Sequence, residues 1–439
     1  MKKINTYDEA VAYLLEIPKF TKKNTMEDTK AFLKELKLPL EHKKIIHVAG
    51  TNGKGSVCFY LNNLLNCAGK NTGLFTSPHL VDIRERFRID GEMVSKQAFF
   101  EAFSVVYDKV MSKYEDALNG YHPTFFEFLF FMAMLLFKEE KTEYIILETG
   151  LGGMLDATNA LDKKELTMIT RIGLDHTEYL GNTIEEVALQ KAGIIRPDTK
   201  VLYFGDDRVS GTVIEAYAGK QGAIVQSVDK KLWKDEKFRD KNIDFSYKSR
   251  YYDYIAITMS GIATYQIENI SMALAALENL LTVKEMPTVE EIQDVLKATV
   301  WQGRMEEVLP DVFLDGAHNE NGICAFLDSV RKTAKGKKSL LFTVVSDKDY
   351  KTIIREIVES QLFDKIVITG LDNSRALSVQ EILQNFYECG RKEIVVIDDV
   401  ERAFVSLCRE KEEGERIFVA GSLYLVGRIK EIIGRNQND

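Results

Sequence analysis

One stretch near the amino terminus, residues 43–65, constrains the fold of this chain more than any other. It begins with an apolar run over Ile45–Ala49, continues through the glycine-rich segment Gly50–Ser56, and then shows leucines at helical spacing as far as Leu65. A strand, a glycine-rich turn and a helix in this order predict a phosphate-binding loop. Glycines let backbone N–H groups converge on an anion, and the start of the helix adds about half a positive charge.

Two side chains of this loop carry the expected chemistry. Lys54 can reach the outer phosphates of a nucleotide, and the Ser56 hydroxyl can face a Mg²⁺ ion. The usual pattern places serine or threonine directly after the lysine, whereas Gly55 intervenes here. The alternative is an ordinary turn with a surface lysine, which the coincidence of glycines, a lysine and a hydroxyl disfavours.

Composition excludes several classes of protein. The formal net charge of −9 argues against general nucleic-acid binding. The five cysteines lack metal-ligand spacing and are typical of free thiols in a reducing cytosol. The most apolar stretch, Phe125–Phe137, is shorter than the ~20 residues that span a bilayer and contains Glu127, so it predicts a buried helix. We therefore expect a cytoplasmic protein with no nucleic-acid partner and no membrane partner.

Strand and helix signals alternate through the whole chain. After residue 305, five short apolar runs are each followed by helical spacing, which is typical of a doubly wound α/β domain. Trp301–Arg304 has the character of a domain join. The predicted fold is α/β. It has an N-terminal P-loop ATPase domain with a parallel-rich central sheet at 1–299, a linker at 300–305, and a C-terminal Rossmann-like doubly wound domain at 306–439.

Short-range signals predict individual elements. Thr183 and Glu186 have the spacing of a capping box, which predicts the start of a helix. Arg84, Arg86 and Arg88 alternate with apolar residues, which predicts a half-exposed strand.

Polar side chains gather where predicted strands end. In a parallel α/β sheet, ligands bind at the carboxyl ends of the strands. Four residues fall at such ends: Ser56, Ser77, Glu148 and His176. Together they would form a divalent-metal site, in which Mg²⁺ prefers oxygen and His176 suits Mn²⁺ better. The alternatives stay open: His176 as a loop histidine, Glu148 as a paired strand-end acid, and Lys191, on a later helix, as a solvated lysine.

A set of short motifs occurs in one order along nearly the whole chain. They are GTNGKGS (50–56), TSPHL (76–80), PTFFE (123–127), ETGLGGMLDATN (148–159), GLDHTEYLG (173–181), KAGII (191–195), QIEN (266–269), WQGRME (301–306), LDGAHN (314–319) and SDKD (346–349). With this set the chain resembles folylpolyglutamate synthase/dihydrofolate synthase, in the Mur ligase superfamily. The resemblance implies an ATP-dependent amide-forming ligase that adds L-glutamate to a folate, and it leaves open whether dihydropteroate is an acceptor too. The reaction would pass through an acyl phosphate and release ADP and phosphate.

The resemblance also implies cofactors and the residues that hold them. ATP would be bound by Asn52, Gly53, Lys54, Gly55, Ser56, Gln266, Asn269, Arg304 and Asp315, with Asn269 on the adenine. Mg²⁺ or Mn²⁺ would be bound by Ser56, Ser77, Glu148, His176 and Lys191. Lys191 matches the lysine that the superfamily carbamylates with CO₂. The implied catalytic residues are Lys54, His176, Lys191, Arg304 and His318.

Substrate residues are implied in both domains. The pterin would lie near Thr124, Leu155, Asp156 and Ala157 of the N-terminal, Mur-central-type domain. Glutamate would bind near Ser422 and Tyr424 of the C-terminal, glutamate ligase domain. Met154 stands where many members have arginine, which bears on substrate preference. Arg84, Arg86, Arg88 and Arg375 are candidates for an acidic glutamate tail, with ordinary surface charges as an equal alternative.

Two other functions remain as alternatives. One is a different Mur-type ligase with a cell-wall UDP-muramyl acceptor, and the other is a nucleotide-binding regulatory protein without catalysis. The TSPHL, PTFFE and LDATN motifs favour the folate branch. We expect the partners to be a folate or dihydropteroate and L-glutamate, and the protein to be a monomer.

Overall fold

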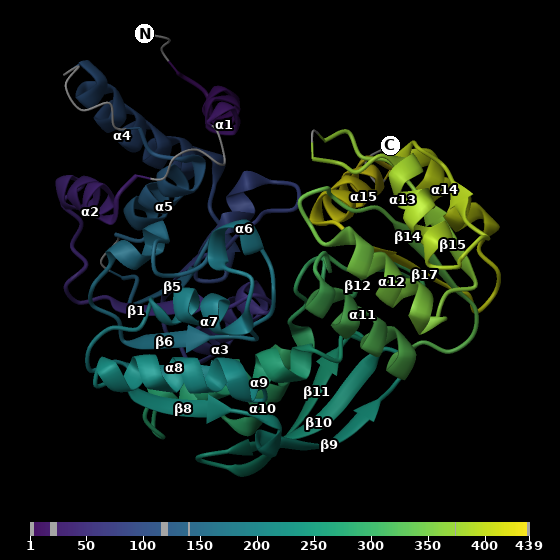
Figure 1. Cartoon of the computed structure of the whole chain (residues 1–439). Coiled ribbons are helices and arrows are strands. Elements are labelled where there is room, and N and C mark those ends of the chain that lie inside the picture. Colours follow the sequence, from purple (N-terminus) through teal and green to yellow (C-terminus); the bar gives the residue numbers. More distant parts are fainter. Residues whose placement is uncertain (1–3, 18–23, 116–121, 139–140, 374, 437–439) are drawn as a thin grey trace. The chain divides into compact units, whose positions relative to one another are not determined.

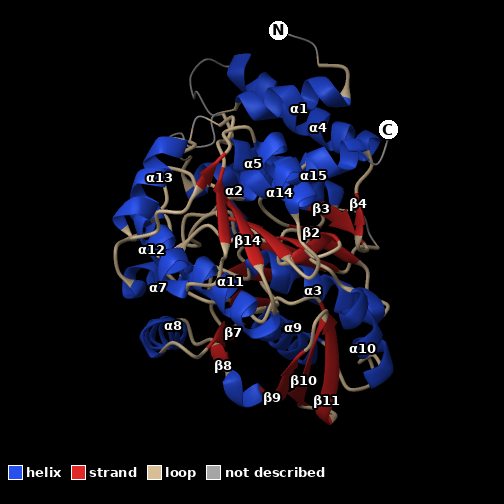
Figure 2. Cartoon of the chain, turned by 90° about the vertical axis from the view of Figure 1, so that its right-hand side faces the viewer, coloured by secondary structure: helices blue, strands red, loops and turns tan. Residues whose placement is uncertain are grey.

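The computed structural model describes residues 4–17, 24–115, 122–138, 141–373 and 375–436 (Figure 1). The chain forms two compact units. The first unit comprises Met1–Ile172, Thr183–Asp229 and Met272–Ile292, and the second comprises Gly173–Asn182, Lys230–Ser271 and Gln293–Asp439. Figure 2 distinguishes the helices of the chain from its strands by colour.

An eight-stranded sheet forms the centre of the first unit, in the order β4-β3-β2-β5-β1-β6-β7-β8. Its strands are β1 (Lys44–Ala49), β2 (Thr72–Phe75), β3 (Phe87–Ile89), β4 (Glu92–Met93), β5 (Tyr144–Glu148), β6 (Leu166–Ile169), β7 (Lys200–Phe204) and β8 (Ile224–Val228). Neighbouring strands from β2 to β8 are parallel, and β3 and β4 add an antiparallel edge. β1 is buried from Ile45 onward because it lies between β5 and β6 with helices on the sheet faces.

Helices of the first unit cover this sheet. They are α1 (Tyr7–Glu16), α2 (Met26–Glu35), α3 (Lys54–Cys67), α4 (Lys96–Glu115), α5 (Phe125–Leu136), α7 (Ile184–Ala192) and α8 (Arg208–Lys220), with short 3₁₀ helices η1 (Ile83–Arg86) and η2 (Ala157–Ala160). α5 is apolar around its circumference and almost wholly buried, which confirms the predicted buried helix. Its Phe131 stacks on Phe32 of α2 with ring centroids 4.3 Å apart. The capping box of Thr183 and Glu186 at the start of α7 is also confirmed.

The predicted strand over Arg84–Arg88 is wrong in its first half. Ile83–Arg86 form η1, and only Phe87–Ile89 form a strand. Asp82 accepts a hydrogen bond from the backbone N–H of Arg84, and Glu85 accepts one from the backbone N–H of Asp82. These local bonds satisfy backbone groups that a sheet would otherwise pair, so the turn forms in spite of the alternating pattern.

The second unit contains two sheets. β9 (Trp233–Phe238), β10 (Asn242–Ser249) and β11 (Asp253–Ser260) form an antiparallel sheet. The larger sheet has the order β12-β13-β17-β14-β15-β16, with β12 (Glu306–Leu309), β13 (Val312–Leu314), β14 (Lys338–Phe342), β15 (Lys365–Ile368), β16 (Val395–Val396) and β17 (Arg416–Ala420). All its pairings are parallel except β12 with β13.

The remaining helices include α9 and α10, which both units share, and the helices of the doubly wound domain. They are α6 (Thr177–Leu180), η3 (Lys230–Leu232), α9 (Gln266–Leu280), α10 (Val289–Ala298), α11 (Glu320–Thr333), α12 (Tyr350–Ser360), α13 (Val379–Glu388), α14 (Val400–Glu410) and α15 (Leu423–Asn436). Helices α11–α15 alternate with strands β13–β17, so the α/β fold class with a parallel-rich first sheet and a doubly wound second one is confirmed. Across the described ranges, none of the helices has the length and apolar character needed to cross a bilayer.

Candidate active site

The glycine-rich loop leaves β1 and leads directly into α3. Gly50 has φ +153° and Gly53 has φ +88°, both in the region that favours glycine. The loop is held from one side, since the Thr51 and Asn52 N–H groups donate to the carbonyl of Arg171 and the Thr170 hydroxyl donates to that of Asn52, at 2.7 Å. The start of α3 therefore faces the carboxyl edge of the sheet with its backbone N–H groups, as an anion site requires.

Lys54 and Lys191 meet at one backbone oxygen. The Nζ of Lys191 donates to the Gly50 carbonyl at 2.7 Å, and the Nζ of Lys54 donates to the same oxygen at 3.0 Å and to that of Thr51 at 3.2 Å. Lys191 is 3% exposed, so the alternative of a solvated lysine is wrong. Two side chains separated by more than a hundred residues thus stand together at the phosphate loop.

Glu148 and Ser77 lie at the same edge of the sheet. Val48 of β1 is the register partner of Glu148 at the end of β5, so the glycine-rich loop and this carboxylate leave adjacent parallel strands. The Glu148 Oε2 accepts a hydrogen bond from the Ser77 N–H at 2.9 Å, and the carboxylate is 3% exposed. Ser56, in the first turn of α3, is also buried. The first unit therefore brings Lys54, Ser56, Ser77, Glu148 and Lys191 to one edge.

The Cys58 thiol of α3 lies within the electrostatic influence of both Glu148 and Lys54. Burial raises the pKa of Cys58 in α3 well above its usual value, the Glu148 carboxylate raises it further, and the Lys54 ammonium lowers it. The Cys58 side chain is fully buried.

The donor set at this edge fits a hard divalent cation. Among the described residues, no three His, Cys, Asp or Glu side chains stand together as a ready-made metal cluster. Mg²⁺ is commonly held by one or two carboxylates together with substrate phosphates and water, rather than by a full protein cage. One buried carboxylate, Glu148, with the hydroxyls of Ser56 and Ser77 nearby agrees with that mode.

His176 lies in the second unit, within a cluster of charged side chains. It has φ +50° and stands directly before the short helix α6. Its neighbour Asp175 accepts hydrogen bonds from Lys348 Nζ at 2.5 Å and from Asn319 Nδ2 at 3.0 Å. The Nε2 of His318 is 3.9 Å from the Asp175 carboxylate, and that of His176 is 3.4 Å from Lys348 Nζ.

Electrostatics in this cluster are set by Lys348. Burial would raise the pKa of Asp175, but the ammonium of Lys348 and the neighbouring histidines hold it well below its usual range. Burial and Lys348 lower the pKa of His318 to about 4, so this imidazole is neutral at pH 7. Asp175 and Lys348 stand inside the GLDH and SDKD motifs, yet neither is among the site residues predicted from the sequence.

Arg304 and Asp315 are neighbours in the second unit. Asp315 is buried and accepts hydrogen bonds from the Tyr265 hydroxyl at 2.5 Å and from the Met305 N–H at 3.0 Å. Burial raises the pKa of Asp315, against the opposing effect of the Arg304 guanidinium. A Cβ at Gly316 would lie 2.3 Å from Arg304 NH1, so the arginine covers the backbone of this loop.

Gln266 and Asn269 form a buried amide pair in the first turn of α9. The Asn269 Nδ2 donates to Gln266 Oε1 at 2.7 Å, and both side chains are less than a tenth exposed. Their i, i+3 spacing places them on one face of the helix, as the predicted adenine contact requires.

The predicted pterin residues lie in the first unit. Thr124 is the N-cap of α5 and bonds to Glu127. Leu155 is 64% exposed, whereas Asp156 and Ala157 are buried. The Asp156 carboxylate accepts hydrogen bonds from the backbone N–H groups of Leu151 and Thr158, so its partners are those of a loop-shaping side chain.

Ser422 and Tyr424 follow β17 in the second unit. Ser422 is buried and its hydroxyl accepts a hydrogen bond from the Tyr424 N–H at 3.2 Å. The Tyr424 hydroxyl lies 3.3 Å from an Arg375 nitrogen, and Arg375 is ion-paired with Asp347. These side chains lie beyond the carboxyl ends of β14, β15 and β17, where a doubly wound domain binds its ligand.

The arginines at 84, 86 and 88 have protein partners. Arg84 is paired with Asp82, Arg86 donates to His79, and Arg88 donates to the carbonyl of Gly91. These contacts support the interpretation of ordinary structural charges.

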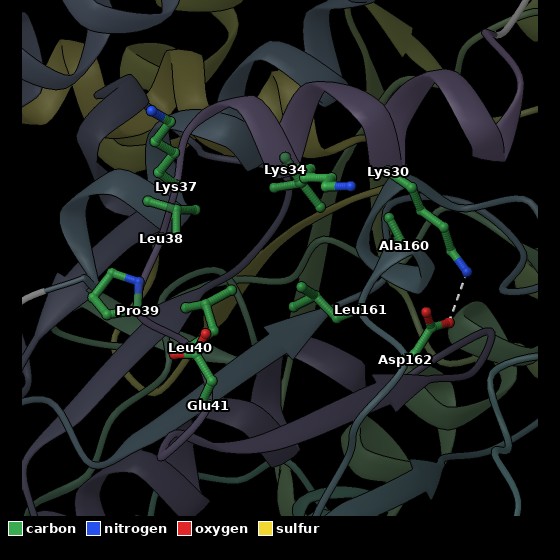
Figure 3. Close-up of a pocket in the computed structure, with 11 residues that line it drawn as sticks. Lys30, Lys34, Lys37, Leu38, Pro39, Leu40, Glu41, Ala160, Leu161 and Asp162 are labelled. Atoms are coloured by element: carbon green, nitrogen blue, oxygen red, sulfur yellow. Dashed lines mark hydrogen bonds and ion pairs between the residues drawn. The ribbon is translucent and has the colours of Figure 1, made fainter.

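A groove of about 650 Å³ lies elsewhere on the first unit (Figure 3). It is lined by Lys30, Leu33, Lys34, Lys37, Leu38, Pro39, Leu40, Glu41, Ala160, Leu161 and Asp162. Lys30 and Asp162 form an ion pair across it, at 2.7 Å. Its walls lead into the amino ends of β1 and β6, at the edge of the sheet opposite the phosphate loop, and include none of the predicted site residues.

Comparison with known proteins agrees with this architecture. The Mur ligase middle domain model matches residues 48–277, and the Mur ligase, glutamate ligase domain model matches residues 303–423. The dihydrofolate synthase/folylpolyglutamate synthase of Bacillus subtilis is 30% identical over 435 residues, which are 97% of this chain and 98% of that protein. This chain belongs to the folylpolyglutamate synthase family of Mur ligases.

Solved structures of folylpolyglutamate synthases share the fold over the whole length. FolC of Escherichia coli, in complex with DHPP and ADP, is 26% identical with a TM-score of 0.83 and 99% coverage of both chains. The bifunctional folylpolyglutamate synthase/dihydrofolate synthase of Yersinia pestis, complexed with AMPPNP and a Mn ion, is 27% identical with a TM-score of 0.82 and 98% coverage of both chains. The family resemblance expected from the motifs is therefore confirmed.

Proposed function

We propose that this protein is an ATP-dependent ligase that adds L-glutamate to a folate, with dihydropteroate as a second acceptor. One observation carries the proposal most directly. Lys54 and Lys191 share the Gly50 carbonyl beside a buried carboxylate at the carboxyl edge of the sheet, in a chain 30% identical throughout to a dihydrofolate synthase/folylpolyglutamate synthase.

The chemistry follows from the charges. In the first step an oxygen of the acceptor carboxylate forms a bond to the γ-phosphorus of ATP, and ADP leaves. In the second step the amine of glutamate forms a bond to the carbonyl carbon, and phosphate leaves with loss of a proton from nitrogen. Because the first step brings two anions together, it depends on positioning and on positive charge.

Residues of the first unit meet that demand. The N–H groups at Gly53 and Gly55 would hold the phosphates, and Lys54 would neutralise the γ-phosphate. Asn52, whose N–H donates to the Arg171 carbonyl, would shape the loop around them. Mg²⁺ or Mn²⁺, held by Ser56, Ser77 and Glu148, would supply further charge neutralisation when bound. His176, which the motifs imply as a further ligand, belongs to the second unit.

Residues of the second unit have proposed roles of their own. We assign Gln266 and Asn269 to the adenine, Arg304 and Asp315 to the nucleotide, and His318 to the reacting groups. Ser422 and Tyr424 would hold the incoming glutamate. The division into domains at 1–299 and 306–439, with a linker at 300–305, is part of this proposal. So is a monomeric protein located in the cytoplasm. Light scattering of the purified chain would test the monomeric state.

Carbamylation of Lys191 is the least direct part of the proposal. Its side chain is buried and ends at the phosphate loop, where a carboxylate would serve better than an ammonium as a metal ligand. The ammonium would first lose a proton, and the neutral amine would then form a bond to the carbon of CO₂ with loss of a second proton from nitrogen, which gives that carboxylate. A ¹³C carbamate signal after exposure to labelled bicarbonate, absent from Lys191→Arg, would support it. Lys191→Ala should lower turnover by more than about tenfold, or ~1.4 kcal/mol of barrier.

Incubation with ATP, Mg²⁺ and glutamate against three acceptors tests the function. Product mass is measured with a tetrahydrofolate, with dihydropteroate and with a UDP-muramyl acceptor. A gain of one glutamyl residue on a folate or on dihydropteroate is the expected result. Transfer only to the UDP-muramyl acceptor would favour the other Mur-type ligase, and ADP release indifferent to every acceptor would favour a regulatory nucleotide-binding protein.

A further inference from the structure

The segment that follows β5 presents one apolar side chain outward and turns its polar side chains inward. Leu155 is 64% exposed, whereas every residue of η2, Ala157–Ala160, is buried. The inward-facing side chains have two separate sets of partners. Each set fixes the segment from a different direction.

The first anchor is His47 in the middle of β1. The Thr158 hydroxyl donates to Asp156 Oδ1 at 2.5 Å, so it accepts the hydrogen of His47 Nε2, which lies 2.7 Å away. His47 Nδ1 is consequently the bare nitrogen, and it is a buried atom without a hydrogen-bond partner among the described residues. Burial and the nearby cations Lys164 and Arg196 lower the pKa of His47 well below its usual value, which keeps the ring neutral.

The second anchor is Asn159, whose amide uses every hydrogen-bonding position it has. Its Nδ2 donates to the carbonyls of Met154 at 3.0 Å and Gly193 at 3.1 Å. Its Oδ1 accepts from Lys164 Nζ at 2.7 Å and from Arg196 at 2.8 Å. Because both cations can face only the oxygen, the amide has a single possible orientation.

Through this amide the segment is joined to the end of α7. Gly193 immediately follows α7, and the Met154 N–H donates to the carbonyl of Gln190 at 2.8 Å. The two backbones touch directly, since a Cβ at Gly153 would lie 2.8 Å from the Gln190 oxygen and one at Gly193 would lie 2.5 Å from Met154 Cβ. Lys191, in the last turn of α7, reaches the Gly50 carbonyl.

We propose that Asn159 is a positioning residue that couples Leu155–Ala157 to the turn of α7 that carries Lys191. This inference rests on the proposed function in one respect, namely that the acceptor binds at Leu155–Ala157. The two donated hydrogen bonds hold the acceptor surface in a fixed position relative to Lys191 and the phosphate loop. The hydrogen bonds to Met154 use only its backbone N–H and carbonyl, so they do not depend on the identity of its side chain.

The kinetic test is Asn159→Asp, which keeps the size of the side chain and its bonds from the two cations. It removes both donors, to Met154 and Gly193. Asn279→Ala in α9 is the matched control, because that amide also donates two hydrogen bonds in a helix, to Gln226 Oε1 and the Ala275 carbonyl. We expect Asn159→Asp to raise KM for the acceptor by about tenfold or more, as for other residues that orient a ligand-binding group, with KM for ATP unchanged.

Two results would overturn the proposal. If Asn159 only stabilises the fold, Asn159→Asp would lower the melting temperature and leave KM for the acceptor as in the wild type. Full retention of wild-type kinetics by Asn159→Asp would show that the donated bonds do not position the acceptor.

A second measurement needs no substrate and separates this inference from the proposed function. Amide hydrogen exchange of residues 151–156 and 190–194 is followed in the ligand-free wild type, in Asn159→Asp and in Asn279→Ala. Coupling predicts that exchange increases together in both segments of Asn159→Asp and in neither segment of the control. Faster exchange in one segment alone would refute the coupling, even if no acceptor supports activity.

Discussion

Gly50→Ala is the sharpest test of how the phosphate loop is held. An ideal Cβ at Gly50 would lie 1.8 Å from the Thr170 hydroxyl oxygen, 3.0 Å from its Cβ and 3.2 Å from its Cα. The hydroxyl cannot simply turn away, because it is buried and donates to the Asn52 carbonyl on the same loop. The φ of +153° adds strain for any residue with a Cβ.

The size of the effect follows from this close approach. Non-bonded heavy atoms lie about 3.5 Å apart when they touch, so the loop must move by more than about 1 Å. The Gly50 carbonyl that receives Lys54 and Lys191 moves with it. A displacement of about 1 Å at a catalytic site costs on the order of 100-fold, or about 2.7 kcal/mol of barrier.

The assay is kcat/KM for ATP, measured by ADP release with saturating acceptor and glutamate. Gly219→Ala is the control, because a Cβ at that position of α8 meets nothing within 4 Å. It should leave activity unchanged and stabilise the helix by about 0.5–1 kcal/mol. Adding Thr170→Gly to Gly50→Ala should recover only part of the activity. It removes the clash with the Thr170 side chain, but the crowding against the backbone at position 170 and the strain at φ remain, and the hydrogen bond from the Thr170 hydroxyl to the Asn52 carbonyl is lost. Wild-type kcat/KM in Gly50→Ala would refute the claim that Thr170 fixes the loop.

Three further predictions concern single charges. Glu148→Gln should raise the Mg²⁺ concentration for half-maximal activity by about tenfold or more, as measured by metal titration, and an unchanged value would remove Glu148 from the metal site. Asp175→Asn removes the negative charge that pairs with the buried ammonium of Lys348. It should lower the free energy of unfolding, measured with urea, by about 3–5 kcal/mol. Because the folded pKa of Asp175 is depressed, the wild-type contribution is present above about pH 4 and is lost as the pH falls further, a dependence absent from the variant. His47 is neutral and buried in the folded protein. As the pH falls, its imidazole is therefore protonated at a higher pH in the unfolded chain than in the folded one. The free energy of unfolding should decrease as the pH is lowered from about 6.5, and this group contributes at most ~1.4 kcal/mol per pH unit to that decrease. His47→Gln should reduce the slope.

The elements that the sequence predicts well are those set by neighbours in the chain. The strand, turn and helix over residues 44–67 are as expected, because the apolar run, the glycines and the leucine spacing all act within a few residues. At Ile83–Arg86 the local pattern led to a wrong prediction. The residues alternate as in a strand, but Asp82 and Glu85 cap a 3₁₀ turn there. Two local signals competed there, and the hydrogen bonds prevailed over the alternation.

Interactions between distant side chains follow from the topology and leave no local trace. Asp175 and Lys348 form a buried ion pair across 173 positions of the chain. Asn159 donates to the carbonyl of Gly193 and accepts from Arg196, which lie 34 and 37 positions along the chain. No spacing within a helix or strand marks either partner. The motifs GLDH and SDKD contain the first pair, but only the folded second unit shows which of their residues meet.

Lys191 is an intermediate case, and periodicity alone could have decided it. The buried residues of α7 are Val187, Ala188, Lys191 and Ala192, which recur at the spacing of one helix face. A lysine inside an apolar stripe must place its amine among buried groups, and a buried charge needs a specific partner. The interpretation of Lys191 as a solvated lysine therefore contradicted the pattern around it. The same stripe also carries a test of the site: moving the lysine one position, with Gln190→Lys in Lys191→Ala, keeps the charge on α7 but turns it off the buried face. If the position of the amine matters, this double variant should be as inactive as Lys191→Ala, and recovery of activity would mean that any charge near the end of α7 suffices.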